Sequence, residues 1–322
     1  MNRLIFRRQT LSRFVFCLTL LLSILSGLCL SADVRVINPR LNMPKHKKYK
    51  LSICAVVKNE DKFLKEWIEY HRLVGVDHFY IYDIGNYERT SSTLRSYIRQ
   101  NIVSLIPWPY GSREYDSTQP FLWALSTQVP AYENAAKYKA VRETKWMVFL
   151  DVEEFLVPPH VNNLADILER YDAYPGVVLP SNYFDASKID CVPRRNLVIQ
   201  SIELTSAPKV DIERCVKKVI FKPDQTEGFL WPPYQCCFTD NKEPVELSRN
   251  ELRINHYVNR FSGFLNYARN KEKLSIDQCT LSDAETANLL EVGYEIEDGE
   301  RAIQRFTPEL LKKMGLEPGW GW

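Results

Sequence analysis

Two acidic residues separated by a single residue follow an apolar segment near the middle of the chain. Asp151 and Glu153 come directly after residues 146–150, a run with the composition of a buried strand. Carboxylates at this spacing can reach one hard cation from a bend, and Mg²⁺ and Mn²⁺ usually bind through one or two carboxylates plus substrate phosphates. The pair therefore predicts a Mn²⁺ or Mg²⁺ site, completed by the diphosphate of a nucleotide-sugar. Solvated loop acids are the alternative.

Other polar residues sit where they can join such a site. His256 ends the apolar segment 252–255 and is a candidate third metal ligand or diphosphate contact, with a hydrogen-bonded core histidine as the alternative. Lys218, in an expected strand over 216–221, is a candidate phosphate contact, against a solvated lysine. His71, His78 and His160 are expected to be structural.

The elements that must hold these residues alternate between strand and helix. Strands are expected at 51–57, 76–82, 103–108 and 146–150, and helices at 63–71, 92–99 and 121–142. This alternation specifies an α/β fold with a mostly parallel sheet, and ligands bind beyond the carboxyl ends of such strands. The run 58–60, Asp83 and the acid pair all fall at those ends.

Beyond Pro158 the pattern is less regular. A helix is expected at 164–171, strands at 176–179, 216–221 and 255–257, a loop at 229–234 and a helix at 260–274. This half is expected to face the acceptor. The acids of this half are candidate general bases that would deprotonate an acceptor hydroxyl, chiefly Asp185 and Glu246, with Asp240 and Glu243 left open.

The N-terminus carries a targeting signal. Four arginines precede an uncharged apolar stretch at 14–30, so residues 1–32 are expected to be a signal anchor or a cleaved signal peptide, followed by a stem at 33–49. The basic flank places the catalytic part across the membrane. The net charge of +2 over 322 residues argues against a nucleic-acid partner. Of the eight cysteines, Cys54 is expected to be a buried free thiol.

Three ordered motifs carry a family resemblance. They are Val57-Lys58-Asn59-Glu60 with the following 66–71 and 75–83, the run 145–155 around the acid pair, and Ile254-Asn255-His256-Tyr257. Together they resemble glycosyltransferase family 92. The resemblance implies a GT-A-like fold over 51–275. It also implies a UDP-sugar donor, with galactose favoured, a glycan acceptor, Mn²⁺ and an inverting displacement. Residues 276–322 are expected to form a C-terminal helical extension.

The resemblance assigns a role to several residues of this chain. Asp151 and Glu153 take the metal-motif positions and His256 takes the C-terminal histidine position. Asp83 sits where an acid meets the nucleoside, and the segment that contains Val57, Asn59 and Glu60 lines the uracil pocket. The expected location is the Golgi membrane, as a single-pass type II protein with a lumenal catalytic domain; a secreted or bacterial envelope protein is the alternative.

The chain departs from the family pattern at two places. Glu153 stands where aspartate is more usual, so its carboxylate reaches further. Residues 181–185 differ from the family's aromatic-Phe-Gly sequence, which leaves the acceptor open. An inactive relative that binds sugar or nucleotide and a metal-dependent hydrolase are the competing hypotheses.

Overall fold

The computed structural model describes residues 42–109, 124–185, 197, 199, 217–230, 235–258 and 302–316. These residues belong to one compact unit, 42–322. The expected anchor at 1–32 lies outside them, as does the expected helix at 260–274. Within the described ranges, no helix is both long and apolar enough to cross a membrane.

The first half of this unit alternates strands with helices, as the sequence predicts. Its elements are β1 (Tyr49–Val57), α2 (Asp61–Leu73), β2 (His78–Asp83), α3 (Tyr87–Arg99), β3 (Val103–Pro107), α5 (Val129–Asn134) and β4 (Thr144–Phe149). The helix expected at 121–142 is α5 flanked by two π-helical segments, η1 (Ala124–Gln128) and η2 (Ala135–Ala140). Helix α3 begins five residues before the helix expected at 92–99, because the Asn86 side chain caps it by accepting a hydrogen bond from the Arg89 backbone N–H.

The second half is built from shorter elements. They are β5 (Glu154–Val157), α6 (Leu164–Arg170), β6 (Gly176–Leu179), β7 (Ser181–Asp185), β8 (Lys218–Phe221), η3 (Pro223–Gln225), β9 (Thr226–Leu230), β10 (Gln235–Phe238), η4 (Thr239–Asn241), β11 (Val245–Glu246), β12 (Arg253–Val258), η5 (Ala302–Phe306) and α10 (Thr307–Met314). The loop expected at 229–234 is wrong at its first two residues. Residues 229–230 belong to β9, which forms a hairpin with β10.

One large sheet organises the unit. Its strand order is β11-β6-β8-β4-β1-β2-β3, and among these described strands only β8 runs against its neighbours. Strands β5, β12 and β7 form a second, three-stranded sheet. The α/β class with a mostly parallel central sheet is thereby confirmed, and it agrees with the GT-A-like expectation.

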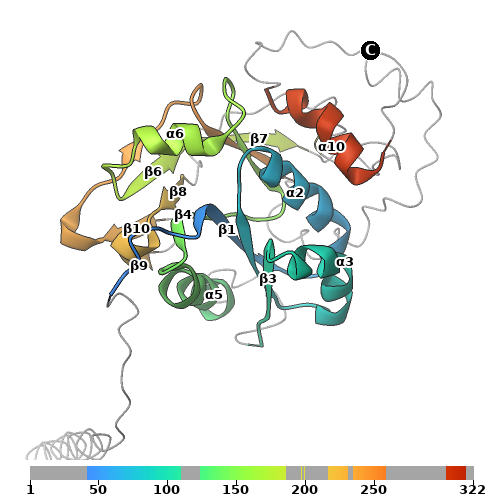
Figure 1. Cartoon of the computed structure of the whole chain (residues 1–322), viewed down its shortest axis with the longest axis horizontal. Helices are drawn as coiled ribbons and strands as arrows, with labels where there is room; N and C mark the ends of the chain where they lie inside the picture. Colours follow the sequence, from blue (N-terminus) through green and yellow to red (C-terminus); the bar gives the residue numbers. More distant parts are fainter. Residues whose placement is uncertain are drawn as a thin grey trace, which may run out of the picture. The chain divides into compact units, whose positions relative to one another are not determined.

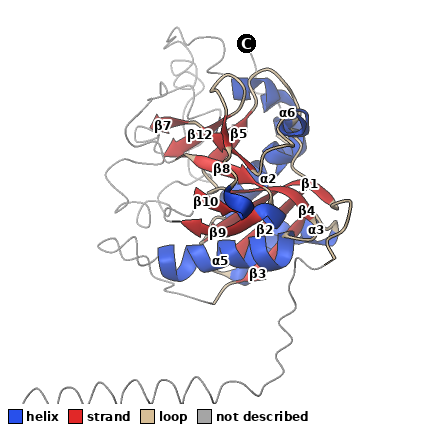
Figure 2. Cartoon of the chain, turned by 90° about the vertical axis from the view of Figure 1, so that its left-hand side faces the viewer, coloured by secondary structure: helices blue, strands red, loops and turns tan. Residues whose placement is uncertain are grey.

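Helices cover both faces of the large sheet (Figure 2). Leu51, Ile53 and Ala55 of β1 belong to the core cluster that includes α2, α3, α6 and α10. The intervening Cys54 faces the opposite cluster, which includes α5, and it is a buried free thiol as expected. A strand buried on both faces needs apolar residues at consecutive positions, which explains the continuous apolar run of β1.

The C-terminal helix is part of this core. Helix α10 lies beside α2 (Figure 1), and Phe306 just before it makes an edge-to-face contact with Tyr70 of α2. Arg305 donates hydrogen bonds to the backbone carbonyls of Pro158, Pro159 and Val161, in the loop after β5. The described part of the expected extension, residues 302–316, thus packs against α2 and against the loop after β5, the strand that follows the acid motif.

Candidate active site

The site lies where the connections of the large sheet change direction. From β1 the chain proceeds to β2 and β3 on one side, whereas β4 pairs with β1 on the other side. In open α/β sheets the crevice at such a switch point, beyond the carboxyl ends of the strands, is the usual ligand site. The segments at this point are 58–60 after β1 and 151–153 after β4, so the sequence expectation for their placement is met by the topology.

The acid motif turns sharply after β4. The Leu150 backbone N–H still donates to the Cys54 carbonyl, at 3.1 Å, and Glu154 N–H already donates back to the Asp151 carbonyl, at 3.0 Å. The Asp151 and Glu153 side chains are 24% and 20% exposed, whereas Glu154 is 3% exposed. The turn therefore leaves two carboxylates partly exposed and draws the third inward.

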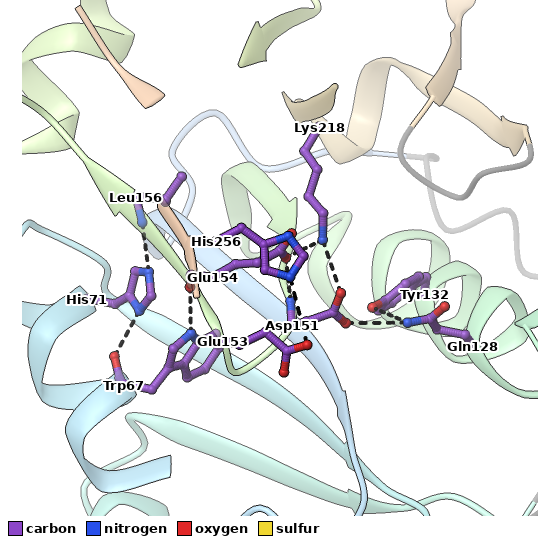
Figure 3. Close-up of polar contacts among 10 residues, drawn as sticks. All are labelled: Trp67, His71, Gln128, Tyr132, Asp151, Glu153, Glu154, Leu156, Lys218 and His256. Carbon is purple, nitrogen blue, oxygen red and sulfur yellow. Dashed lines mark hydrogen bonds and ion pairs between the residues drawn. The ribbon is translucent and has the colours of Figure 1, made fainter. Parts of the chain in front are cut away.

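His256 is brought to this turn by strand pairing. In β12 it lies opposite Glu154 of β5, and the next backbone N–H, that of Tyr257, donates to the Glu153 carbonyl at 2.9 Å. The His256 ring has Nε2 3.8 Å from Glu153 Oε1 and Nδ1 3.7 Å from Glu154 Oε1 (Figure 3). Burial lowers the pKa of His256, but the two carboxylates outweigh it and leave this pKa raised.

Lys218 approaches the turn from β8. Its ammonium forms ion pairs with Glu154 and, at 3.4 Å, with Asp151 Oδ2 (Figure 3). Both Lys218 and Glu154 are 3% exposed. Burial raises the pKa of Glu154 and the Lys218 charge opposes that rise, with a net upward direction. Lys218 is therefore a buried cation in the acid cluster and not the solvated lysine that the sequence left open.

Two further residues belong to this cluster and were not predicted as site residues. Gln128 of η1 donates from Nε2 to Asp151 Oδ1 at 3.4 Å and to the Tyr132 hydroxyl at 3.2 Å. Glu154 is the second. Its signal in the sequence was its place beside the acid pair, whereas Gln128 gave no signal beyond lying in an expected helix.

The structure also shows an open cleft of about 610 Å³ beyond β1 and β2. It is lined by Lys58, Asn59, Ile84, Gly85, Asn86, Tyr87 and Glu88. Asn59 has a left-handed backbone, with φ of 58°, which turns the chain after β1. Asp83 Oδ1 accepts the Gly85 N–H at 2.6 Å, whereas its Oδ2 is buried and has no hydrogen-bond partner among the described residues. A buried, unsatisfied carboxylate oxygen beside a cleft suits a ligand that donates a hydrogen bond.

Of the predicted cofactor-binding residues, Asn59 lines this cleft, whereas Val57, Glu60, Asp83 and Lys218 are not among its lining residues. The Val57 side chain is buried in the core cluster under α2, because the alternation of β1 turns it inward, and its carbonyl accepts the Ile84 N–H. The Glu60 side chain is also buried, and its backbone carbonyl begins α2 by accepting from Phe63 and Leu64. The prediction for Val57 is corrected accordingly.

The predicted general bases have different outcomes. Glu246 lies on the edge strand β11, from which β6 and β8 separate the acid motif, and its exposed carboxylate pairs with Lys217 Nζ at 2.7 Å. It is not brought to the site, and that prediction is corrected. The β7–β12 pairing places the Asp185 backbone beside Val258, two residues after His256, but its side chain lies outside the described part. The Asp240 side chain is exposed.

The donor set suits a divalent ion that a ligand helps to hold. Over the described residues, no three His, Cys, Asp or Glu side chains are arranged to hold an ion. The 3.8 Å between His256 Nε2 and Glu153 Oε1 is too long for a hydrogen bond. It is within the separation of about 4 Å that two ligands of one Mg²⁺-sized ion can have. Such ions take one or two carboxylates plus phosphates, so Glu153 and His256 fit part of this kind of site, with Asp151 on the same turn and the remaining positions left to phosphate oxygens.

Residues 47–277 match the protein family described as glycosyltransferase family 92. The chain belongs to glycosyltransferase family 92. A family 92 protein of Oryza sativa subsp. japonica is 28% identical over 225 residues, which cover 68% of this chain and 35% of that protein. One from Ricinus communis is 27% identical over 134 residues, covering 41% of this chain and 22% of that protein. The chain thus spans about a third or less of the length of these curated relatives.

Solved structures show more distant similarity to this family 92 chain. A mannosyltransferase from Pyrobaculum calidifontis, in complex with GDP-Man and Mn²⁺, has a TM-score of 0.38 and 12% identity. The alignment covers 85% of this chain and 74% of that one. A UDP-glucose pyrophosphorylase complexed with UDP-glucose has a TM-score of 0.26 and 9% identity, with 65% and 91% covered.

Proposed function

We propose that this family 92 member is a metal-dependent glycosyltransferase that moves a hexose from a UDP-sugar to a glycan acceptor, with inversion. The observation that carries the proposal is that the partly exposed Asp151 and Glu153, with His256 beside them, follow β4, and the cleft follows the neighbouring strands β1 and β2 at the same ends. A nucleoside in that cleft would have its diphosphate directed toward the acid turn, because both lie beyond the neighbouring strands β1, β2 and β4.

Each group of residues has one task in this proposal. Asp83 Oδ2 accepts a hydrogen bond from the uracil or the ribose. Because Oδ1 is already engaged by Gly85 N–H, one oxygen remains for the ligand, which suits the single N–H on the edge of uracil. Lys218 supplies a fixed positive charge beside Asp151. A Mn²⁺ or Mg²⁺ held by Asp151, Glu153 and His256 would neutralise charge on the departing diphosphate.

The transfer also needs a base that accepts the proton of the acceptor hydroxyl. Asp185 stays our candidate, because β7 carries it along the strand that pairs with His256. The Golgi location with a lumenal catalytic domain stays a prediction from residues 1–32.

Thermal unfolding of the full chain with and without Mn²⁺ tests the proposal. A UDP-sugar at about a hundred times its Kd should stabilise the protein by about 2.7 kcal/mol, or several degrees in Tm, only when Mn²⁺ is present. Asp151→Ala combined with Glu153→Ala should abolish the shift and the release of UDP. Glu246→Ala is the matched control, since that acid lies away from the cluster.

The outcomes separate the competing functions. A Mn²⁺-dependent shift without sugar transfer or UDP release would indicate a binding protein without activity. A shift with GDP-mannose and none with any UDP-sugar would refute the proposed donor. A shift that survives the double substitution would refute the proposed site.

A further inference from the structure

Glu154 is the least exposed acid of the cluster and contacts three of its members, Asp151, Lys218 and His256. Its Oε2 accepts the Asp151 backbone N–H at 2.8 Å and the Lys218 ammonium. Its Oε1 faces Nδ1 of His256 at 3.7 Å. Figure 3 shows the Glu154 carboxylate between the Lys218 ammonium and the His256 ring. One buried side chain thus touches the turn that carries the acids, the cation and the histidine.

This geometry is unlike that of a metal ligand. Asp151 and Glu153 keep about a fifth to a quarter of their side-chain surface open, whereas Glu154 keeps 3%. Both Glu154 oxygens are directed at groups of the protein: Oε2 at an N–H and an ammonium, and Oε1 at the imidazole. An ion could reach this carboxylate only by displacing those groups.

Nor does stability by itself account for the Glu154–Lys218 pair. Removing a carboxylate and an ammonium from water costs several kcal/mol per ion, and replacing a buried ion pair by apolar residues is often neutral or stabilising. The pair does hold Lys218 Nζ 3.4 Å from Asp151, on the side where a diphosphate would lie. It also places a carboxylate 3.7 Å from Nδ1 of His256, an ion-pair distance, while Nε2 on the other side of the ring faces Glu153. Carboxylates commonly stand behind metal-bound histidines in this order.

We propose that Glu154 is a positioning residue that holds Lys218 and His256 toward the donor diphosphate and its ion. The inference rests on the proposed function in one respect, that the diphosphate binds on the Asp151 and Glu153 side. The contacts of Glu154 themselves exist without any ligand.

Two variants of the full chain and one control test the role. Glu154→Gln removes the charge but keeps the size of the side chain. Glu154→Gln combined with Lys218→Met removes the pair at constant net charge, so the double variant remains informative if the single one is unstable. Glu69→Gln is the control, because Glu69 of α2 is another buried acid whose partners, Tyr97 of α3 and Arg72 of α2, lie outside the cluster.

The first measurement needs no ligand. Acetylation of Lys218 by acetic anhydride, followed by peptide mass spectrometry, should be about tenfold or more faster in Glu154→Gln than in the wild type. Glu69→Gln should leave the rate unchanged. Equal Lys218 rates in wild type and Glu154→Gln would overturn the inference whether or not the protein is a glycosyltransferase.

The second measurement uses Mn²⁺ with UDP, and uridine alone. Both Glu154 variants should bind Mn²⁺ in the presence of UDP about 10- to 100-fold more weakly than wild type, the usual loss when a carboxylate behind a metal site is removed. Uridine, which lacks phosphates, should bind within about twofold of wild type. Unchanged Mn²⁺ binding, or an equal loss for uridine, would overturn the inference. Absence of Mn²⁺·UDP binding by the wild type would instead refute the proposed function, and the labelling result would then decide the role of Glu154.

Discussion

His71 offers a quantitative test of how the acid motif is supported. It is fully buried in α2, where Nδ1 lies 2.8 Å from the Trp67 carbonyl and Nε2 lies 3.3 Å from the Leu156 backbone N–H. This pairing requires a neutral ring with the proton on Nδ1, because Nε2 must accept from Leu156. Leu156 lies in β5, directly after the acid turn. Trp67, Tyr70, Phe79 and Phe155 surround the imidazole.

Burial in this aromatic environment lowers the pKa of His71 from 6.5 to about 3, and the hydrogen bond to Trp67 opposes the shift only in part. Above pH 6.5 the folded and unfolded chains both hold a neutral imidazole. As the pH falls below 6.5 the unfolded chain binds a proton at His71 and the folded chain does not. The free energy of unfolding therefore falls by about 1.4 kcal/mol per pH unit, or about 2 kcal/mol between pH 7.5 and pH 5.

Substitution His71→Leu removes this proton linkage and two hydrogen-bond partners. At pH 7.5 it should destabilise the protein by about 2–4 kcal/mol, mainly because the Leu156 N–H is left buried and unsatisfied. At pH 5 the free energy of unfolding of the wild type has fallen by about 2 kcal/mol, a loss that the variant cannot share. The difference in this free energy between wild type and His71→Leu should therefore shrink to about 0–2 kcal/mol.

Urea denaturation of both full chains at pH 7.5 and pH 5 measures this difference. Tyr70→Phe is the matched control, since it removes the neighbouring hydrogen bond to the Leu156 carbonyl without a group that titrates in this range. The destabilisation caused by Tyr70→Phe should be the same at both pH values. A His71→Leu cost that does not change with pH would contradict the neutral, buried imidazole.

Two further substitutions test the cleft and the C-terminal segment. In Gly85→Ala the new Cβ would lie 2.9 Å from the Asn59 backbone nitrogen. Overpacking of this kind costs about 1–3 kcal/mol. Uridine binding, followed by NMR, should therefore weaken about tenfold while the fold persists. An unchanged affinity for uridine would show that the cleft does not hold the nucleoside. Arg305→Met removes hydrogen bonds to three carbonyls in the loop after β5 and should cost about 2–4 kcal/mol in urea denaturation, with uridine affinity within about twofold. A cost below about 0.5 kcal/mol would mean that Arg305 does not anchor that loop.

The sequence by itself determined the alternating elements and the place of the acid motif. The run 51–57 lies within β1, the strand expected at 176–179 is β6 residue for residue, and Asp151 and Glu153 follow β4. These features are local, because the side-chain period of a strand and the residues that end it are written in consecutive positions. The family resemblance, confirmed over 47–277, rested on the same kind of ordered local motifs.

Which residues meet was decided only by tertiary structure. Lys218 reaches Glu154 across 64 positions of sequence, and His256 reaches it through the pairing of β12 with β5. Glu246 had the right chemistry but lies on the far edge strand. Val57 belongs to the right segment, but its side chain points into the core. The reason is that neighbouring strands are chosen by packing of the whole chain, and a shift of one residue in register exchanges the face that a side chain occupies.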